Sequence, residues 1–338
     1  MKQINIAQAL SENIPIVDVR SEGEYSIAHI PNASNIPLMN NHERKLVGTE
    51  YRKKGNSAAL KLGHYLVGPR FLDIKKHLKL VSKNNRLIIH CWRGGKRSEI
   101  IYKLAEEAKL EPLRIEGGYR SYRNWCREVL CIKRNLFVLS GKTGAGKTDL
   151  LQMLRNSSIQ IFDLEKLANH KGSVFGGLGK ESQPTQEMFE NLLANHWHKL
   201  ENQPVFVENE SRMIGKLFIP EPFFIRLKQH DVLHVELPLK VRKERIIEEY
   251  GSFSKLNILT CALKLKKRLG GLRLKNIEKS LEVGSYEWVD VLLDYYDKGY
   301  DYHKEKYNQR IIRNFHGNDL QQIHDQIIEW LNEKNYPK

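Results

Sequence analysis

Residues 141–148, Gly-Lys-Thr-Gly-Ala-Gly-Lys-Thr, constrain the fold of this chain more than any other stretch. They match the pattern Gly-x4-Gly-Lys-Thr, in which backbone N–H groups surround one phosphate and the lysine reaches the next. The pattern binds phosphate when it joins a buried strand to a helix. Here an apolar run, 136–139, precedes it and an amphipathic segment, 149–155, follows it. The sequence therefore predicts an α/β domain that binds a diphosphate or triphosphate, without identifying the compound.

The residues of this loop have separate expected tasks, because amides and an ammonium group bind phosphate whereas a hydroxyl binds Mg²⁺. Thr148 is the expected Mg²⁺ ligand. The predicted phosphate-binding residues are Gly141, Thr143, Gly144, Gly146, Lys147 and Thr148.

Acidic side chains at the ends of neighbouring strands could complete a Mg²⁺ site. Asp163 follows the apolar pair Ile161-Phe162 of one predicted strand, and Glu208 and Glu210 follow the apolar residues Val205-Phe206-Val207 of another. For each of the three, a helix cap or an ion pair with Arg212 is an equally good explanation. Mg²⁺ is therefore expected without a firm metal site.

A second loop, residues 90–98, reads His-Cys-Trp-Arg-Gly-Gly-Lys-Arg-Ser and lies between a predicted strand and a predicted helix. Loop amides and the N-terminus of the following helix favour a thiolate at Cys91, and nearby cationic side chains add to this effect. The alternative is a buried cysteine with no chemical role. The loop favours the first reading, with Cys91, Arg93 and Arg97 as the predicted catalytic residues.

The net charge of +15 and the pI of about 9.5 favour a polyanionic partner such as a nucleic acid. Four cysteines in 338 residues are too few for a disulfide scaffold, and their spacing suits no zinc site. The sequence shows no signal-peptide pattern and no apolar run long enough for a membrane span. We therefore expect a cytoplasmic protein with no membrane partner.

Predicted strands alternate with predicted helices, which is typical of parallel sheets covered by helices. We expect two α/β domains, residues 1–132 and 133–338, the second with a helical C-terminal part from about residue 256. The glycine-containing polar stretch before residue 86 is expected to be irregular. The predicted strands are 14–19, 86–90, 113–116, 136–139, 160–164, 205–208 and 232–237.

The thiol loop resembles the active-site loops of two families. His90-Cys91-x5-Arg97-Ser98 matches the protein-tyrosine-phosphatase signature, and the same segment resembles rhodanese (sulfurtransferase) domains. Upstream stretches resemble the rhodanese N-terminal signature, so the first domain is expected to be rhodanese-like. The loop is one residue longer than in typical single-domain rhodaneses, which suits a tetrahedral group such as phosphate or selenophosphate. The upstream stretches are Asp18-Val19-Arg20, Glu24-Tyr25, Ala28-His29-Ile30-Pro31, Asn32-Ala33 and Asn35-Ile36-Pro37.

With a P-loop NTPase-like domain following, residues 1 to about 250 resemble the tRNA 2-selenouridine synthase family, and the terminal helical part carries little recognisable motif. The stretches that carry this resemblance, besides the two loops, are 116–123 (Glu-Gly-Gly-Tyr-Arg-Ser-Tyr-Arg), 172–176 (Gly-Ser-Val-Phe-Gly), 183–186 (Gln-Pro-Thr-Gln) and 207–215 (Val-Glu-Asn-Glu-Ser-Arg-Met-Ile-Gly).

The resemblance implies a transferase that acts on the wobble 2-thiouridine of Lys, Glu and Gln tRNAs. Such an enzyme first S-geranylates the thiouridine with geranyl diphosphate and then replaces the geranylthio group with selenium from selenophosphate. It implies that Cys91 is the selenium-carrying residue and that the phosphate loop holds the diphosphate. It also implies two co-substrates, no tightly bound cofactor, and an enzyme that produces selenophosphate as a partner.

Contacts to tRNA and to the prenyl tail are harder to place. Tyr119, Arg120 and Arg123 mix basic and aromatic side chains, as a surface for phosphates and bases does, although a solvated helix face has the same composition. Phe175, Phe189 and Trp197 are candidates for an apolar prenyl pocket, but residues at helical spacing more often form a core.

Two other functions remain open from the sequence. A phosphatase–kinase-like enzyme acting on a phosphorylated metabolite would use both loops but leave the basic surplus without a role. A tRNA-binding or sulfur-relay adaptor would explain the charge but leave the phosphate loop purely structural.

Overall fold

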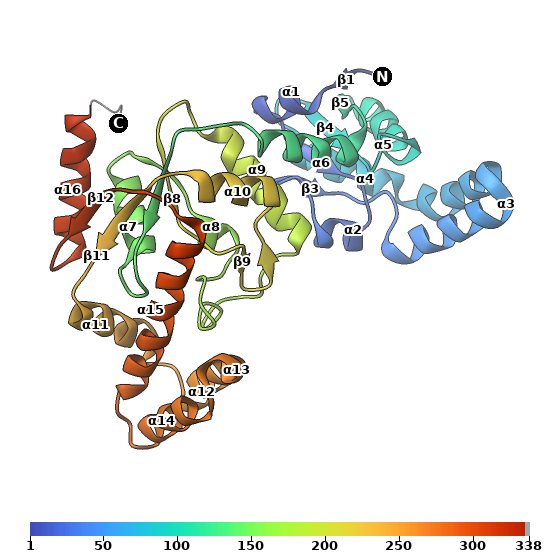
Figure 1. Cartoon of the computed structure of the whole chain (residues 1–338). Helices are drawn as coiled ribbons and strands as arrows, with labels where there is room; N and C mark the ends of the chain where they lie inside the picture. Colours follow the sequence, from blue (N-terminus) through green and yellow to red (C-terminus); the bar gives the residue numbers. More distant parts are fainter. Residues whose placement is uncertain (335–338) are drawn as a thin grey trace. The chain divides into compact units, whose positions relative to one another are not determined.

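The computed structural model describes residues 1–334 and divides into two compact units (Figure 1). Unit 1 consists of residues 1–129 together with 190–195, and unit 2 consists of 130–189 and the chain from 196 onward. Each unit has its own parallel five-stranded sheet, so the expected α/β class is confirmed. No helix in the described part of the chain is both long and apolar enough to span a bilayer.

The elements of unit 1 follow the expected alternation of strands and helices. They are β1 (Gln3–Ile4), α1 (Ile6–Ser11), β2 (Ile16–Asp18), α2 (Glu22–Ile27), β3 (Ser34–Asn35), α3 (Asn41–Val67), the 3₁₀ helix η1 (Gly68–Arg70), α4 (Phe71–Val81), β4 (Arg86–His90), α5 (Lys96–Glu107), β5 (Glu111–Ile115) and α6 (Gly118–Val129).

The sheet of unit 1 has the order β1-β5-β4-β2-β3 with every neighbouring pair parallel. Its central strand, β4, is buried from Leu87 to His90, which explains its uninterrupted apolar sequence. The thiol loop begins directly after this strand. In such sheets ligands bind at the carboxyl ends of the strands, so the fold places Cys91 where binding sites usually form.

The stretch before β4, which we expected to be irregular, is helical, so that expectation is wrong. Helix α3 starts with a capping box, in which Asn40 Oδ1 accepts from Glu43 N at 2.8 Å and Glu43 Oε2 accepts from Asn40 N at 2.9 Å. The glycines bend and pack the helix rather than end it. Gly55, with φ +82°, kinks α3, and a Cβ placed on Gly63 would lie 3.9 Å from Val47 Cγ2 in the first half.

Unit 2 contains the remaining elements, except that residues 190–195 of α9 belong to unit 1. They are β6 (Leu136–Ser140), α7 (Lys147–Asn156), β7 (Gln160–Phe162), α8 (Leu164–Leu167), α9 (Gln186–Lys199), β8 (Val205–Glu208), β9 (Met213–Ile214), β10 (Leu217–Phe218), α10 (Glu221–Gln229), β11 (Val232–Glu236), α11 (Leu239–Tyr250), α12 (Lys255–Lys264), α13 (Lys266–Leu269), α14 (Gly271–Glu282), α15 (Glu287–Tyr307), β12 (Ile311–His316) and α16 (Leu320–Glu333).

The sheet of unit 2 has the order β12-β11-β6-β8-β7, again fully parallel. The chain leaves β6 toward β7 and β8 on one side and later fills the other side with β11 and β12. The phosphate loop therefore follows the strand at which the direction of winding reverses, and a crevice forms at such a point. Residues 136–140 and 147–156 confirm the strand and the helix predicted around the loop.

The C-terminal region is helical as expected, apart from one strand. Helices α12–α15 share a separate apolar cluster that includes Ile258, Ile277 and Trp288. Strand β12 was not predicted, because only Phe315 of its residues is buried and an edge strand lacks a continuous apolar run. Helix α16 then packs Ile323 against the sheet core.

Candidate active site

The thiol of Cys91 lies at the start of α5, within hydrogen-bond distance of a backbone N–H group and a serine hydroxyl. Its side chain is 3% exposed, and Sγ accepts a hydrogen bond from the backbone N–H of Gly95 at 3.2 Å. Ser98 Oγ lies 3.3 Å from the same sulfur and donates to Gly95 O at 2.9 Å. The thiol thus donates to Ser98 Oγ, while the Gly95 amide and the N-terminus of α5 face the sulfur with the positive ends of their dipoles.

The start of α6 supports the thiol loop from behind. The backbone N–H groups of Tyr119 and Arg120 donate to the carbonyl oxygens of Cys91 and Trp92, at 2.8 and 2.9 Å. Gly118 makes this approach possible, because a Cβ there would lie 2.6 Å from Gly94 N and closer still to Cys91 O. The loop geometry therefore depends on a glycine in the 116–123 motif.

A buried ion pair fixes the strand beside the loop. Arg20 Nη2 lies 2.6 Å from Asp18 Oδ2, and the guanidinium stacks 3.9 Å from the ring centroid of Tyr119. Burial favours the neutral form of Asp18, but the charges of His90 and Arg20 and the Arg20 hydrogen bonds lower its pKa overall. Burial lowers the pKa of His90, against the opposing charge of Asp18. Residues 18–20 of the sequence signature thus have a structural role.

The two predicted catalytic arginines have different surroundings. Arg97 Nη1 donates to Glu24 Oε2 at 2.6 Å, and Arg44 Nε lies 2.7 Å from the same carboxylate. Although burial opposes ionisation of Glu24, the hydrogen bond and charge of Arg97 lower its pKa to about 2. Arg93 is exposed on the loop. The thiol loop therefore carries one exposed arginine, Arg93, and one arginine, Arg97, that is held in place by the Glu24 carboxylate.

The phosphate loop has the conformation that its sequence predicts. Gly144 and Gly146 have positive φ angles of 78° and 72°, which turn consecutive amides toward one concave side. Lys147 Nζ donates to Gly141 O at 2.8 Å, so the ammonium group lies across the loop. The carbonyl oxygen of Thr143 accepts from Arg242 Nη1 at 3.0 Å, which ties the loop to α11.

A polar cavity of about 270 Å³ lies against this loop and is lined by it, by four glutamates and by two further cations. The cations are Lys171, which pairs with Glu249, and Arg245, which pairs with Asp149. Five of the six predicted phosphate-binding residues line this cavity, namely Thr143, Gly144, Gly146, Lys147 and Thr148, and Gly141 does not.

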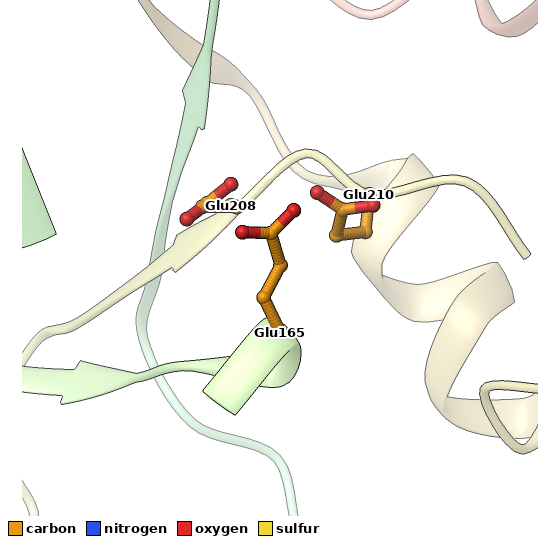
Figure 2. Close-up of side chains that lie close together, drawn as sticks. All are labelled: Glu165, Glu208 and Glu210. Carbon is orange, nitrogen blue, oxygen red and sulfur yellow. The ribbon is translucent and has the colours of Figure 1, made fainter. Parts of the chain in front are cut away.

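Three carboxylates converge beside Thr148, with ligand oxygens all within 4.8 Å of one another (Figure 2). Glu208 ends β8, Glu210 lies on the loop that follows, and Glu165 extends from α8. Thr148 Oγ1 donates to Glu165 Oε2 at 3.0 Å, whereas the buried Glu208 Oε1 has no hydrogen-bond partner. Oxygen ligands in this arrangement fit Mg²⁺.

The pKa values of this cluster reflect unbalanced negative charge. Burial and the charge of Glu210 raise the pKa of Glu165 to about 7. Burial and both neighbouring carboxylates raise the pKa of Glu208 well above its usual range. Burial also raises the pKa of Glu210, against the opposing charges of Lys147 and Lys228. A divalent cation would remove this repulsion and restore full ionisation.

The structure separates Asp163 from the acidic cluster. Its Oδ1 accepts from the backbone N–H of Lys166 at 2.8 Å, as the N-cap of α8, and its Oδ2 accepts from Gln152 Nε2 at 2.7 Å. Sequence reasoning missed Glu165, two residues later, as the third member of the cluster. A cap at Asp163 places Glu165 in the first turn of α8, and this spacing is the signal that could have found it.

The three residues suggested for tRNA contact lie on α6 in different environments. Tyr119 is fully buried, with its hydroxyl accepting from Asn191 Nδ2 at 2.7 Å. Arg123 Nη1 donates to Asn191 Oδ1 at 2.5 Å and its other terminal nitrogen pairs with Glu190. Arg120 is exposed. Of the three, Arg120 is the side chain that presents its charge to solvent.

Comparisons with known proteins match both units. A family profile described as "Rhodanese-like domain" matches residues 4–124, and one described as "tRNA 2-selenouridine synthase AAA domain" matches residues 134–259. The two expected domain types are therefore confirmed.

Curated proteins match over most of the chain. The tRNA 2-selenouridine synthase of Shewanella woodyi is 34% identical over 356 residues, which cover 94% of this chain and 93% of that protein. The protein of the same name from Bdellovibrio bacteriovorus is 33% identical, with coverages of 88% and 90%. The one from Nitrosomonas europaea is 38% identical over 245 residues, or 70% of this chain and 63% of that protein.

Proposed function

Because this chain belongs to the tRNA 2-selenouridine synthase family, we propose that it converts wobble 2-thiouridine in tRNA to 2-selenouridine in two successive reactions. Geranyl diphosphate alkylates the sulfur in the first, and selenium from selenophosphate replaces the alkylated sulfur in the second. The observation that supports this proposal is the presence of two formed loops with inward-facing amides in one chain, the thiol loop and the phosphate loop. The net charge of +15 suits a tRNA substrate.

The phosphate loop serves the first reaction. The sulfur of 2-thiouridine attacks C1 of geranyl diphosphate, the C1–O bond breaks, diphosphate leaves and the N3 proton passes to solvent. Loop amides and Lys147 stabilise the charge that develops on the leaving diphosphate. Mg²⁺ would be held by Thr148 with Glu165, Glu208 and Glu210, and when bound it neutralises diphosphate charge.

The thiol loop serves the second reaction, by a route that needs no oxidant or reductant. The Cys91 thiolate attacks phosphorus of selenophosphate, the P–Se bond breaks and selenide is released. Selenide then attacks C2 of the S-geranyl nucleoside, and the geranylthiolate leaves. Water hydrolyses the S–P bond, which restores the thiol and releases phosphate. Selenium carried on the Cys91 sulfur would require a reductant for its release, so phosphorus is the better target.

The surroundings of Cys91 support this assignment. The Gly95 amide and the start of α5, which stabilise the thiolate, also face a tetrahedral anion bound in front of it. Arg97 is the cation that the Cys-x5-Arg spacing supplies for such an anion, and Glu24 holds it beside the loop. Arg93 supplies a second, exposed positive charge.

Mass analysis of tRNA nucleosides tests the proposal. Purified protein is incubated with 2-thiouridine tRNA, geranyl diphosphate and selenophosphate, and the tRNA is digested. We expect 2-selenouridine from the wild type and S-geranyl-2-thiouridine alone from Cys91→Ala. Cys131→Ala, which changes an exposed cysteine outside the loop, is the matched control and should behave as the wild type. Unchanged 2-thiouridine with the wild type would refute the assignment.

A further inference from the structure

A cavity of about 490 Å³ opens beside Cys91 within unit 1. One wall is the thiol loop, and the other is helix α3, which contributes residues from both sides of its kink at Gly55. The apolar lining includes Val47, Leu60, Val67, Phe71 and Ile100, together with Ala59.

This apolar lining has no role in the chemistry of selenophosphate. A phosphate or selenide anion gains nothing from a surface of aliphatic side chains, because burying its charge there would cost free energy. Cavities of about 300–1,000 Å³ with apolar walls and a few polar groups typically bind small organic groups. The cavity beside Cys91 therefore indicates that the molecule reacting there carries a hydrocarbon chain.

The polar side chains of the cavity indicate how such a molecule is oriented. Arg44, Arg93, Lys96 and Arg97 all line the cavity, and three of them lie on or directly after the thiol loop. A molecule with an apolar tail and a polyanionic body would place its tail against α3 and its body at this basic end. The bond between the two parts would then lie near Cys91.

We propose that this cavity binds the ten-carbon isoprenoid chain of S-geranyl-2-thiouridine during the exchange of sulfur for selenium. This inference rests on the proposed function and adds a binding site for the alkyl group to it. The chain holds C2 of the nucleoside next to the selenium donor, and geranylthiol leaves from the same cavity. The aromatic residues first considered for this role, Phe175, Phe189 and Trp197, do not line this cavity; they belong to unit 2 and are at most 3% exposed.

A change of selectivity for the alkyl group tests the site. Two tRNA substrates are compared, one with S-geranyl-2-thiouridine and one with S-methyl-2-thiouridine, which has the same reacting carbon but no chain. We expect the wild type to convert the geranyl substrate with at least about 10-fold higher kcat/KM, since each filled apolar subsite contributes a factor of this order. Ala59→Phe, which places a ring inside the cavity, should reduce this ratio to about one.

Two controls separate the inference from the proposed function. Ser57→Phe adds the same ring to an exposed position of α3 that does not line the cavity, and it should keep the wild-type ratio. The melting temperature of each variant checks folding. A wild type that makes no 2-selenouridine from either substrate would contradict the proposed function. A wild type that converts both substrates equally, or an Ala59→Phe variant that keeps the wild-type ratio, would overturn the inference alone.

Discussion

Replacing Gly118 with alanine should disturb the thiol loop selectively. The new Cβ would lie 2.6 Å from Gly94 N, about 1 Å short of an ordinary nonbonded separation of about 3.5 Å. It would also contact the backbone oxygen of Cys91. Gly117→Ala is the matched control, because Gly117 has a similar positive φ of 68° but its Cβ would meet only the Ser121 side chain, at 3.1 Å.

The difference between the two variants isolates the clash with the loop. Each substitution puts an L-residue in the left-handed region, which costs roughly 1–2 kcal/mol. Overpacking against fixed backbone adds roughly 1–3 kcal/mol for Gly118→Ala alone. We therefore expect the free energy of local unfolding to be about 2 kcal/mol lower in Gly118→Ala than in Gly117→Ala. This difference corresponds to an equilibrium constant for local opening that is about 30-fold larger.

Hydrogen exchange at the start of α6 measures this difference. The amides of Tyr119 and Arg120 bond to the carbonyls of the thiol loop, so their exchange reports whether the loop is in place. Gly118→Ala should also lose selenation, whereas geranylation at the phosphate loop continues and shows that the chain has folded. Equal exchange rates in the two variants would refute the reasoning, since only the clash distinguishes them.

Three further predictions concern the remaining charged groups. Lys147→Ala should reduce geranylation at least about 100-fold, because it removes the cation that stabilises the leaving diphosphate. In a nucleoside mass assay, the same variant should still selenate tRNA that has already been geranylated. An equal loss of both reactions would contradict this division. The Glu24 carboxylate, with its pKa lowered to about 2, should stabilise the fold fully above about pH 4.3 and lose this effect as the pH falls toward 2. Wild type should therefore exceed Glu24→Gln by about 1 kcal/mol in urea unfolding at pH 7 and match it at pH 2, and a constant difference would argue against the Arg97 pair as its cause. Glu165→Gln should weaken Mg²⁺ binding about 10-fold in calorimetry. Asp163→Ala should keep its Mg²⁺ affinity and lose only the helix cap, which lowers the free energy of unfolding by about 1 kcal/mol. An equal loss of Mg²⁺ affinity in both variants would show that the cap residue is a ligand.

The parts of the fold that could be predicted are those in which local sequence and burial agree. Strand β4 at residues 86–90 is buried from Leu87 onward around an apolar centre, residues 87–89, and its bounds match the prediction. The phosphate loop was predictable for a similar reason, since its glycines, lysine and threonine act through backbone geometry that the sequence specifies locally. The Cys91 loop belongs to the same group.

The features that were missed depend on contacts between distant residues. Helix α3 contains glycines that suggest irregular backbone, yet Gly55 only bends it. Glu165 joins Glu208 and Glu210 because α8 begins directly after β7, close to the point where the neighbouring strand β8 ends. The cavity beside Cys91 was not predicted, because its walls come from segments that the sequence separates by about thirty residues.

The position of α3 in the chain has a consequence for how this enzyme could change. The helix enters after β3 and ends before α4, so none of the strand pairs of the unit 1 sheet includes its residues. Substitutions at the cavity-lining positions of α3 therefore leave the strand register untouched. If the cavity binds the alkyl group as proposed, these positions would set the choice of alkyl group while Cys91 stays on its own strand-to-helix loop. Exchanging α3 for a longer or shorter helical hairpin would be a direct route to a transferase that accepts other isoprenoid lengths.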